Sequence, residues 1–184
     1  CFLTAIELRL DSVYMGSLYL IKGSELYTAE AREENQFKTN FSLIETDVTN
    51  VDGRWVFDMD EIVVEHSHMT RDDFYELYRF KLWGQLVYAA AYLKEIIMHC
   101  LNYDISPLEI YDELITNSKD YSFINTILTD YIESIKPLFF ETPQELEEKL
   151  IKHIEEFGNV DLFYHNRHVQ LTMAKVLNSD NKVT

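Results

Sequence analysis

Cysteine is scarce in this sequence: Cys1 and Cys100 are the only two among 184 residues, and neither belongs to a CxxC or CxxxCxxC arrangement. Two isolated cysteines exclude a disulfide framework, and alone they supply neither a zinc site nor an iron–sulfur cluster. The sequence also lacks a glycine-rich phosphate loop, an HExxH motif, a GxGxxG motif and a Ser-His-Asp pattern. Independent hydrolase, protease and dehydrogenase functions therefore have no support, and a reducing, cytoplasmic setting is expected.

Basic residues are also few, since 16 lysines and arginines are outnumbered by 32 aspartates and glutamates, for a formal net charge of −16. This charge repels phosphate backbones and anionic lipid surfaces. Long hydrophobic runs are missing too. The most apolar stretch, residues 82–93, is closed by Lys81 and Lys94 and is about half the ~20 residues that span a bilayer. We therefore expect no nucleic-acid partner and no membrane partner.

Apolar side chains are plentiful, with 47% hydrophobic and 14% aromatic residues, which is enough for one ordered core. The sequence opens with Cys-Phe-Leu-Thr, and patterned apolar residues begin at Leu3. A lipid-modified N-terminal cysteine is usually followed by a polar tether instead. We therefore expect an excerpt from a longer chain.

The first 69 residues combine short helical and β-type patterns. The expected elements are the end of a helix at residues 3–10, a strand from Ser12 to Ile21, a surface helix from Glu25 to Asn35, and a β-rich stretch at residues 41–68. Within that stretch, Asp52-Gly53 lies between β-branched and aromatic residues and favours the positive φ angles of a type I′ turn. The sequence therefore predicts one strand and one β-hairpin here.

From Thr70 onward the apolar pattern has a helical period. Thr70 offers a hydroxyl cap and Asp73 a carboxylate three residues later, as in a capping box. Apolar residues then recur every three or four positions to about Asn102, which predicts one helix of roughly 50 Å. Two further capping boxes with proline at the first helical position, Ser106-Pro-Leu-Glu109 and Thr142-Pro-Gln-Glu145, predict later helix starts.

Three more patterns complete the helical part. They are an apolar stripe over residues 123–135, a second over residues 146–157 that Gly158 closes at the C′ position, and a last helix at about residues 162–177. The expected fold class is α+β, mostly α, with an N-terminal strand and a β-hairpin followed by a five-helix assembly around the long helix. We place the domain boundary between residues 69 and 70.

Two segments, SLYLIKGSELY at residues 17–27 and DEIVVEHSHMTRDDF at residues 60–74, resemble the region after the core of cobalamin-binding radical S-adenosylmethionine proteins. In that family the last strand of a partial (β/α) barrel ends in a Leu-rich Gly-Ser or Gly-Thr turn. A charged helix, a small β insert, a Val-Val-Glu-x-Ser-x-Met type strand end and a helical region follow. The resemblance covers residues 12–85, under half of the chain, and includes Arg32 in the charged helix.

The resemblance implies a C-terminal, non-catalytic segment of such an enzyme, because the cluster-binding CxxxCxxC motif is absent. Residues 1–69 would be the end of a barrel-like unit with a hairpin insert, and residues 70–184 a helical C-terminal domain. The segment would close the barrel or contribute to substrate recognition. The parent protein would use S-adenosylmethionine, a [4Fe-4S] cluster and cobalamin, and this chain alone would bind none of them.

A second hypothesis comes from the charge and the well-capped helices, which match no enzyme pattern. On this reading the chain is a stand-alone acidic helical module that binds another protein. The two hypotheses differ in the neighbours of residues 12–21. In an excerpt this strand lacks one natural neighbour and lies at an edge, whereas in a complete module it is central.

By the same resemblance, Lys22, Gly23 and Ser24 lie at the C-terminal end of a barrel strand, where active sites of barrels are built. The resemblance thus implies that these three residues help to line a cofactor pocket in the parent protein. The alternative is a plain strand exit in which glycine serves the backbone geometry alone.

Glu65, His66 and His68 end the second β-rich stretch just before a helix N-terminus, where anionic groups are favoured. We expect these side chains to face substrate. Alternation along a strand would place both imidazoles on one face. Two histidines alone supply only part of a metal-ligand set, so a third ligand would have to come from an aspartate (Asp58, Asp60 or Asp72). We therefore predict no metal site.

The remaining histidines lie on predicted helices. His165 and His168 share a face of the last helix, and surface histidines on an acidic domain explain the pair as well as a site does. His99 and His153 lie beside apolar stripes and are expected to be structural.

Overall fold

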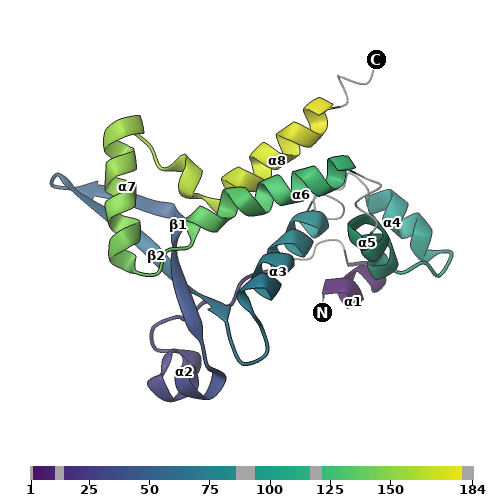
Figure 1. The fold of residues 1–184 in the computed structure, drawn as a ribbon, viewed down its shortest axis with the longest axis horizontal. Helices are drawn as coiled ribbons and strands as arrows, with labels where there is room; N and C mark the ends of the chain where they lie inside the picture. Colours follow the sequence, from purple (N-terminus) through teal and green to yellow (C-terminus); the bar gives the residue numbers. More distant parts are fainter. Residues whose placement is uncertain (1, 11–14, 86–93, 117–121, 180–184) are drawn as a thin grey trace.

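The computed structural model describes residues 2–10, 15–85, 94–116 and 122–179. The fold is α+β and mostly helical, as the sequence predicts, with a long antiparallel hairpin beside a group of helices (Figure 1). Among the described residues, no helix combines the length and the apolar character needed to cross a membrane.

The hairpin consists of β1 (Lys38–Val51) and β2 (Arg54–Glu65), which pair in antiparallel fashion. Its turn has φ of 51° at Asp52 and 83° at Gly53, so both central residues take the left-handed conformation that a type I′ turn requires. The Asn50 side chain also accepts a hydrogen bond from the Gly53 amide, at 3.0 Å. The predicted hairpin turn is therefore confirmed.

The register of the hairpin contains a large irregularity. Leu43 pairs with Met59 and Val48 pairs with Phe57, so residues 44–47 of β1 lie opposite the single residue Asp58. Such surplus residues interrupt the ladder and bend a strand locally. Beyond the irregularity, pairing resumes and continues to the turn.

The strand expected from Ser12 to Ile21 is much shorter in the structure. Tyr19 forms an isolated antiparallel bridge with Ile62, flanked by the bonds Leu20 N to Glu61 O (2.8 Å) and Val63 N to Leu18 O (2.9 Å). The part of the expected strand at residues 12–14 lies outside the described residues. The strand pairs that the structure describes are antiparallel.

The surface helix expected from Glu25 to Asn35 is divided. A 3-10 turn, η1 (Glu25–Tyr27), is followed by α2 (Ala29–Asn35). The break falls at Thr28, whose extended backbone and side-chain oxygen, which accepts from the Ala31 amide, make it the N-cap of α2. A threonine inside the expected helix thus starts a new one.

The other helical elements are α1 (Phe2–Glu7), α3 (Arg71–Gly84), α4 (Lys94–Leu101), α5 (Pro107–Thr116), α6 (Ser122–Ile135), η3 (Lys136–Leu138), α7 (Pro143–Phe157), η4 (Asp161–Phe163) and α8 (His165–Ser179). All three predicted capping boxes are present, and Gly158 ends α7 with φ of 74°. The single helix expected from Thr70 to Asn102 corresponds to α3 and α4. Residues 86–93 between them lie outside the described residues, so its continuity stays a prediction.

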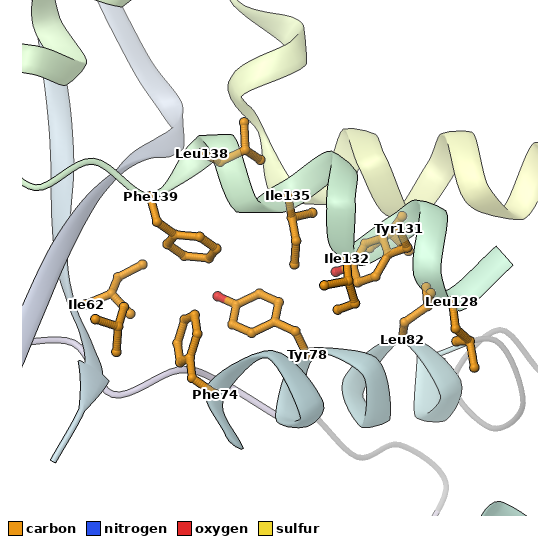
Figure 2. Close-up of a cluster of buried hydrophobic side chains, with 12 residues drawn as sticks. Ile62, Phe74, Tyr78, Leu82, Leu128, Tyr131, Ile132, Ile135, Leu138 and Phe139 are labelled. Atoms are coloured by element: carbon orange, nitrogen blue, oxygen red, sulfur yellow. The ribbon is translucent and has the colours of Figure 1, made fainter. Parts of the chain in front are cut away.

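The central hydrophobic cluster joins the hairpin to the helices. It contains Ile62 and Val64 from β2, Phe74, Tyr78 and Leu82 from α3, Leu128, Tyr131, Ile132 and Ile135 from α6, then Leu138, Phe139 and Val169. Figure 2 shows the rings of Phe74, Tyr78 and Phe139 close together, with centroids 4.9 to 5.5 Å apart. One cluster thus spans the predicted domain boundary between residues 69 and 70.

Two smaller clusters lie on either side. One packs Ile6 of α1 against Trp83 of α3 and Ile97 of α4. The other packs Leu146 and Leu150 of α7 against the hairpin, where Leu43, Val48, Phe57 and Met59 all face the helix. In Figure 1, α7 accordingly crosses the hairpin.

Candidate functional site

The two sequence segments that carry the resemblance meet in space. We use the name strand-edge unit for residues 15–35 together with residues 60–69. Backbone hydrogen bonds join Leu18 and Leu20 to β2, and the Ser67 amide donates to the carbonyl of Asn35 at 3.0 Å. Segments about forty residues apart in the sequence therefore form one structural feature.

The Lys22-Gly23-Ser24 turn follows directly after this short pairing. Gly23 has φ of 88°, and a Cβ added there would meet no atom within 4 Å. The glycine is therefore needed for backbone conformation rather than for a close approach of other atoms. The Ser24 amide donates to the Ile21 carbonyl at 3.0 Å, and Lys22 is exposed and lines a cavity.

A bidentate ion pair between Arg32 and Glu61 joins α2 to β2. The Arg32 Nη1 and Nη2 atoms lie 2.6 and 2.8 Å from the two carboxylate oxygens, and Thr39 donates to the same carboxylate at 2.7 Å. These hydrogen bonds, that from Arg32 first, lower the pKa of Glu61. The Arg32 guanidinium also lies 4.9 Å from the centre of the Tyr27 ring. Arg32 therefore contacts both η1 and β2.

Glu65, predicted to face substrate, is held by two cations. Its carboxylate accepts from Lys38 at 2.8 Å and from Arg71 at 3.1 Å, and both bonds, that from Lys38 first, lower its pKa. Arg71 in turn donates to Asn40, which is buried and donates to the Phe139 carbonyl. The carboxylate thus links β1, β2 and α3, and its role toward a substrate stays a prediction.

His66 and His68 belong to a tight turn between β2 and α3. The His68 amide donates to Nδ1 of His66 at 3.1 Å, and the two rings lie 6.3 Å apart at 80°. His66 also meets the edge of Phe37 and lines a cavity, whereas His68 is exposed. In the described part of the chain, no three His, Cys, Asp or Glu side chains lie close enough together to hold a metal ion.

Two cavities flank the strand-edge unit. The first, of about 290 Å³, lies between residues 15–18, the His66 turn and α3, and its wall is mostly apolar (Met15, Leu18, Val63, Met69, Phe74, Leu77). Ser17 and Tyr78 share a hydrogen bond of 2.9 Å at its wall. The second, of about 590 Å³, contains Lys22 together with Asp58, Asp60 and Glu61. Of the predicted site residues, Lys22 and His66 therefore line different cavities.

A third cavity, of about 210 Å³, lies where α8 begins. Tyr19, Leu43, Ile44, Asp60, Lys81, His165 and Asn166 line it. Of the two explanations left open for His165 and His168, a surface position does not describe His165, which is half-buried. Its Nε2 atom is buried without a hydrogen-bond partner among the described residues, and its ring contacts Phe139 and Tyr78. Burial, with smaller contributions from Lys81 and His168, lowers the pKa of His165 to about 3.

Sequence reasoning missed this cavity although a signal for it exists. His165, Val169 and Thr172 recur at the spacing of one helix face, and the latter two are buried. That periodicity points His165 inward. The sequence suggests Asp60 only as a possible metal ligand. Burial and the neighbouring charge of Asp58 raise its pKa, which marks a carboxylate partly removed from water.

No protein-family model matches this sequence, and no curated protein matches it either.

Proposed function

We propose that this chain is the C-terminal, non-catalytic segment of a cytoplasmic enzyme of the cobalamin-binding radical S-adenosylmethionine class. In that enzyme it closes the barrel or contributes to substrate recognition. The parent protein cleaves S-adenosylmethionine reductively and carries out radical chemistry on a substrate. This chain does not itself carry out that reaction.

The observation that carries the proposal is the strand-edge unit. Two motif segments that resemble one family, separated by about forty residues, are joined by backbone hydrogen bonds and by the Arg32–Glu61 ion pair. Accidental matches to a family pattern have no reason to lie side by side. A shared ancestral unit explains the sequence spacing and the contact together.

The position of residues 18–20 in the sheet supports the same proposal. They pair with β2 on one side, and among the described residues no strand pairs with their other side. Leu18 and the adjoining Ile21 are 42% and 68% exposed. An open strand edge with exposed apolar residues suits further sheet or barrel from the same protein.

The residues present do not fit an iron–sulfur cluster. Cys100 is a half-buried free thiol on α4, and Cys1 lies outside the described residues. Two cysteines so far apart in sequence cannot supply the three clustered thiolates of a CxxxCxxC site. In our proposal the cluster and cobalamin belong to the remainder of the parent enzyme, and Lys22, Gly23 and Ser24 help to line its cofactor pocket.

The test begins with the reading frame that encodes this chain. We expect a CxxxCxxC motif upstream of Cys1. The complete protein, loaded with iron and sulfide without oxygen, should form 5′-deoxyadenosine from S-adenosylmethionine, and the 184-residue chain treated identically should form none. A frame without the motif, or cleavage by the chain alone, would contradict the proposal.

The rival function, an acidic module that binds another protein, predicts a different exchange pattern. If the edge is normally covered by the parent enzyme, the amides of residues 18–20 that do not donate to β2 should exchange rapidly in the isolated chain, whereas the Leu20 amide, which donates to the Glu61 carbonyl, should be protected under both hypotheses. Slow exchange of the amides that do not donate to β2, in a monomer, would favour the independent module. The amides of α6, which packs in the central cluster, provide the slow-exchange reference.

A further inference from the structure

The cavity of about 290 Å³ between residues 15–18, the His66 turn and α3, which we call the His66 cavity, has a wall built from three parts of the chain. Hydrogen bonds hold two of these parts in place. The Val63 amide donates to the Leu18 carbonyl at 2.9 Å, and His66 and Met69 exchange two backbone hydrogen bonds of 2.9 and 3.0 Å. The third part, α3, packs in the central cluster. The wall is therefore preorganised, which lowers the entropic cost of binding a ligand.

Most of this wall is apolar. The apolar side chains are Met15, Leu18, Val63, Met69, Phe74 and Leu77. Two of them are methionines, whose flexible thioethers adapt to the shape of a ligand and make favourable contacts with aromatic rings. A cavity of about 150 Å³ holds one benzene molecule, so a cavity of about 290 Å³ has room for a planar two-ring molecule. The shape and the lining thus favour a compact aromatic ligand.

His66 supplies a hydrogen-bond donor to this apolar wall. The His68 amide donates to Nδ1 of His66 at 3.1 Å. A ring nitrogen accepts a hydrogen bond only when it carries no proton, so the neutral imidazole has its proton on Nε2. Nε2 makes no hydrogen bond within the described part of the chain, and it is not a buried atom. It is therefore the ring nitrogen that can donate to a ligand.

The other polar groups in the wall are compatible with a neutral ligand. The Ser17 and Tyr78 hydroxyls share a hydrogen bond of 2.9 Å, and a hydroxyl with one proton and two lone pairs can bond to a ligand as well. Lys81 also lines the cavity, but its ammonium contacts the Tyr78 ring, 5.3 Å from the ring centre. Among the described residues that line the cavity there is no carboxylate, so a cationic ligand would lie there without a counter-charge.

We propose that the His66 cavity binds a small, neutral, two-ring aromatic molecule that carries one carbonyl group. The rings lie among the apolar side chains, and the carbonyl oxygen accepts a hydrogen bond from Nε2 of His66. Small-molecule sites commonly combine a mostly apolar wall with a few placed polar groups in this way. This inference does not rest on the proposed function, because every residue involved belongs to this chain.

The test is a titration of the 184-residue chain with its methionine methyl groups labelled with carbon-13. The probe is 2-acetylnaphthalene. A hydrocarbon of similar shape, 2-isopropylnaphthalene, has a methyl group in place of the oxygen, and 2-naphthoate is the charged derivative. We expect saturable shifts of the Met15 and Met69 methyl signals with the ketone, and no shift of the Met98 signal, because Met98 packs in a different cluster.

A variant of His66 tests the hydrogen bond. Each probe is compared between two proteins, because the hydrocarbon leaves water more readily than the ketone does. His66→Phe keeps a ring without the donor, so it should weaken binding of the ketone about tenfold and change binding of the hydrocarbon by less than about twofold. His68→Phe is the matched control, since His68 is exposed and is not part of the cavity wall, and it should leave both affinities unchanged.

A second variant locates the site. Leu77 lines the cavity and is 51% exposed, so Leu77→Trp should place a larger ring there without disturbing the fold, which an unchanged urea midpoint would verify. It should weaken both probes at least about tenfold, whereas Leu108→Trp, at a 42% exposed position on α5, should weaken neither. The proposal is overturned if the ketone shifts neither methyl signal, if 2-naphthoate binds more tightly than the ketone, if His66→Phe affects ketone and hydrocarbon alike, or if Leu77→Trp binds normally.

Discussion

Replacing Arg32 with methionine is expected to destabilise the protein by about 2 kcal/mol, because it removes a two-pronged, charge-assisted contact and leaves Glu61 without its cation. Methionine retains an aliphatic side chain over the Tyr27 ring. The perturbation therefore reports mainly on the charge pair that joins α2 to β2.

The magnitude follows from the exposure of the two side chains. The Arg32 side chain is 29% exposed and the Glu61 side chain is 13% exposed, so the pair is intermediate between a surface ion pair and a fully buried one. A surface ion pair contributes about 0–1 kcal/mol, whereas disrupting a buried one costs about 3–5 kcal/mol. In a double-mutant cycle of Arg32→Met and Glu61→Gln we expect a coupling of about 1–2 kcal/mol. For a chain of this size, a loss of 2 kcal/mol lowers Tm by about 4–8 °C.

The assay is urea unfolding of the four proteins of the cycle at neutral and acid pH. The folded-state pKa of Glu61 is lowered, so its contribution is fully present above its ordinary pKa of about 4.3 and is lost as pH falls through the lowered folded value. The coupling should therefore shrink well below about pH 4.

The matched control is the pair Lys136 and Glu133, whose nitrogen and oxygen atoms also lie 2.6 Å apart but whose side chains are 42% and 62% exposed. Its coupling should be about 0.5 kcal/mol or less. If the Arg32–Glu61 coupling is no larger than this control, or does not fall with acid, the assignment of Glu61 as a structural anchor is wrong.

Three further predictions concern other parts of the chain. Thr142→Ala removes the N-cap of α7 and should cost about 1 kcal/mol by urea unfolding, whereas Thr142→Ser should be nearly neutral. Leu150→Ala should cost about 2–5 kcal/mol, because Leu150 is 0% exposed in the cluster between α7 and the hairpin. Replacing both His66 and His68 by alanine should change stability by no more than about 0.5 kcal/mol, and a chelator should leave Tm unchanged. A chelator-induced drop that the double variant abolishes would instead indicate a metal site.

Sequence alone predicts the local features of this fold well. A capping box needs only a hydroxyl and a carboxylate three residues apart, so Thr70, Ser106 and Thr142 are recognisable without knowledge of the rest of the chain. The Asp52-Gly53 turn is equally local, since left-handed φ angles are intrinsic to these residues in a two-residue hairpin loop.

Features set by distant neighbours are less predictable. The strand expected at residues 12–21 reduces to a short pairing because strand length depends on the partner, and only residues 18–20 lie along β2. The environment of His165 depends on Phe139 and Tyr78, which are far away in sequence. The cavity at α8 could be suspected from helix periodicity, but its combination of Asp60 with Lys81 emerges only when three elements pack together.

The surplus residues in β1 determine how this hairpin can change length. Regular alternation would place Leu43 and Val48, five positions apart, on opposite faces, yet both pack toward α7. The irregular residues 44–47 therefore change the alternation of side chains, so that Leu43 and Val48 lie on the same face of the hairpin. If two residues were added to or removed from each strand beyond Val48, the side chains farther along the strand would keep their faces. If one residue per strand were added or removed, those side chains would move to the opposite face. Natural variation in the outer part of the hairpin is thus expected to come in matched steps of two, while its base stays fixed by the helix.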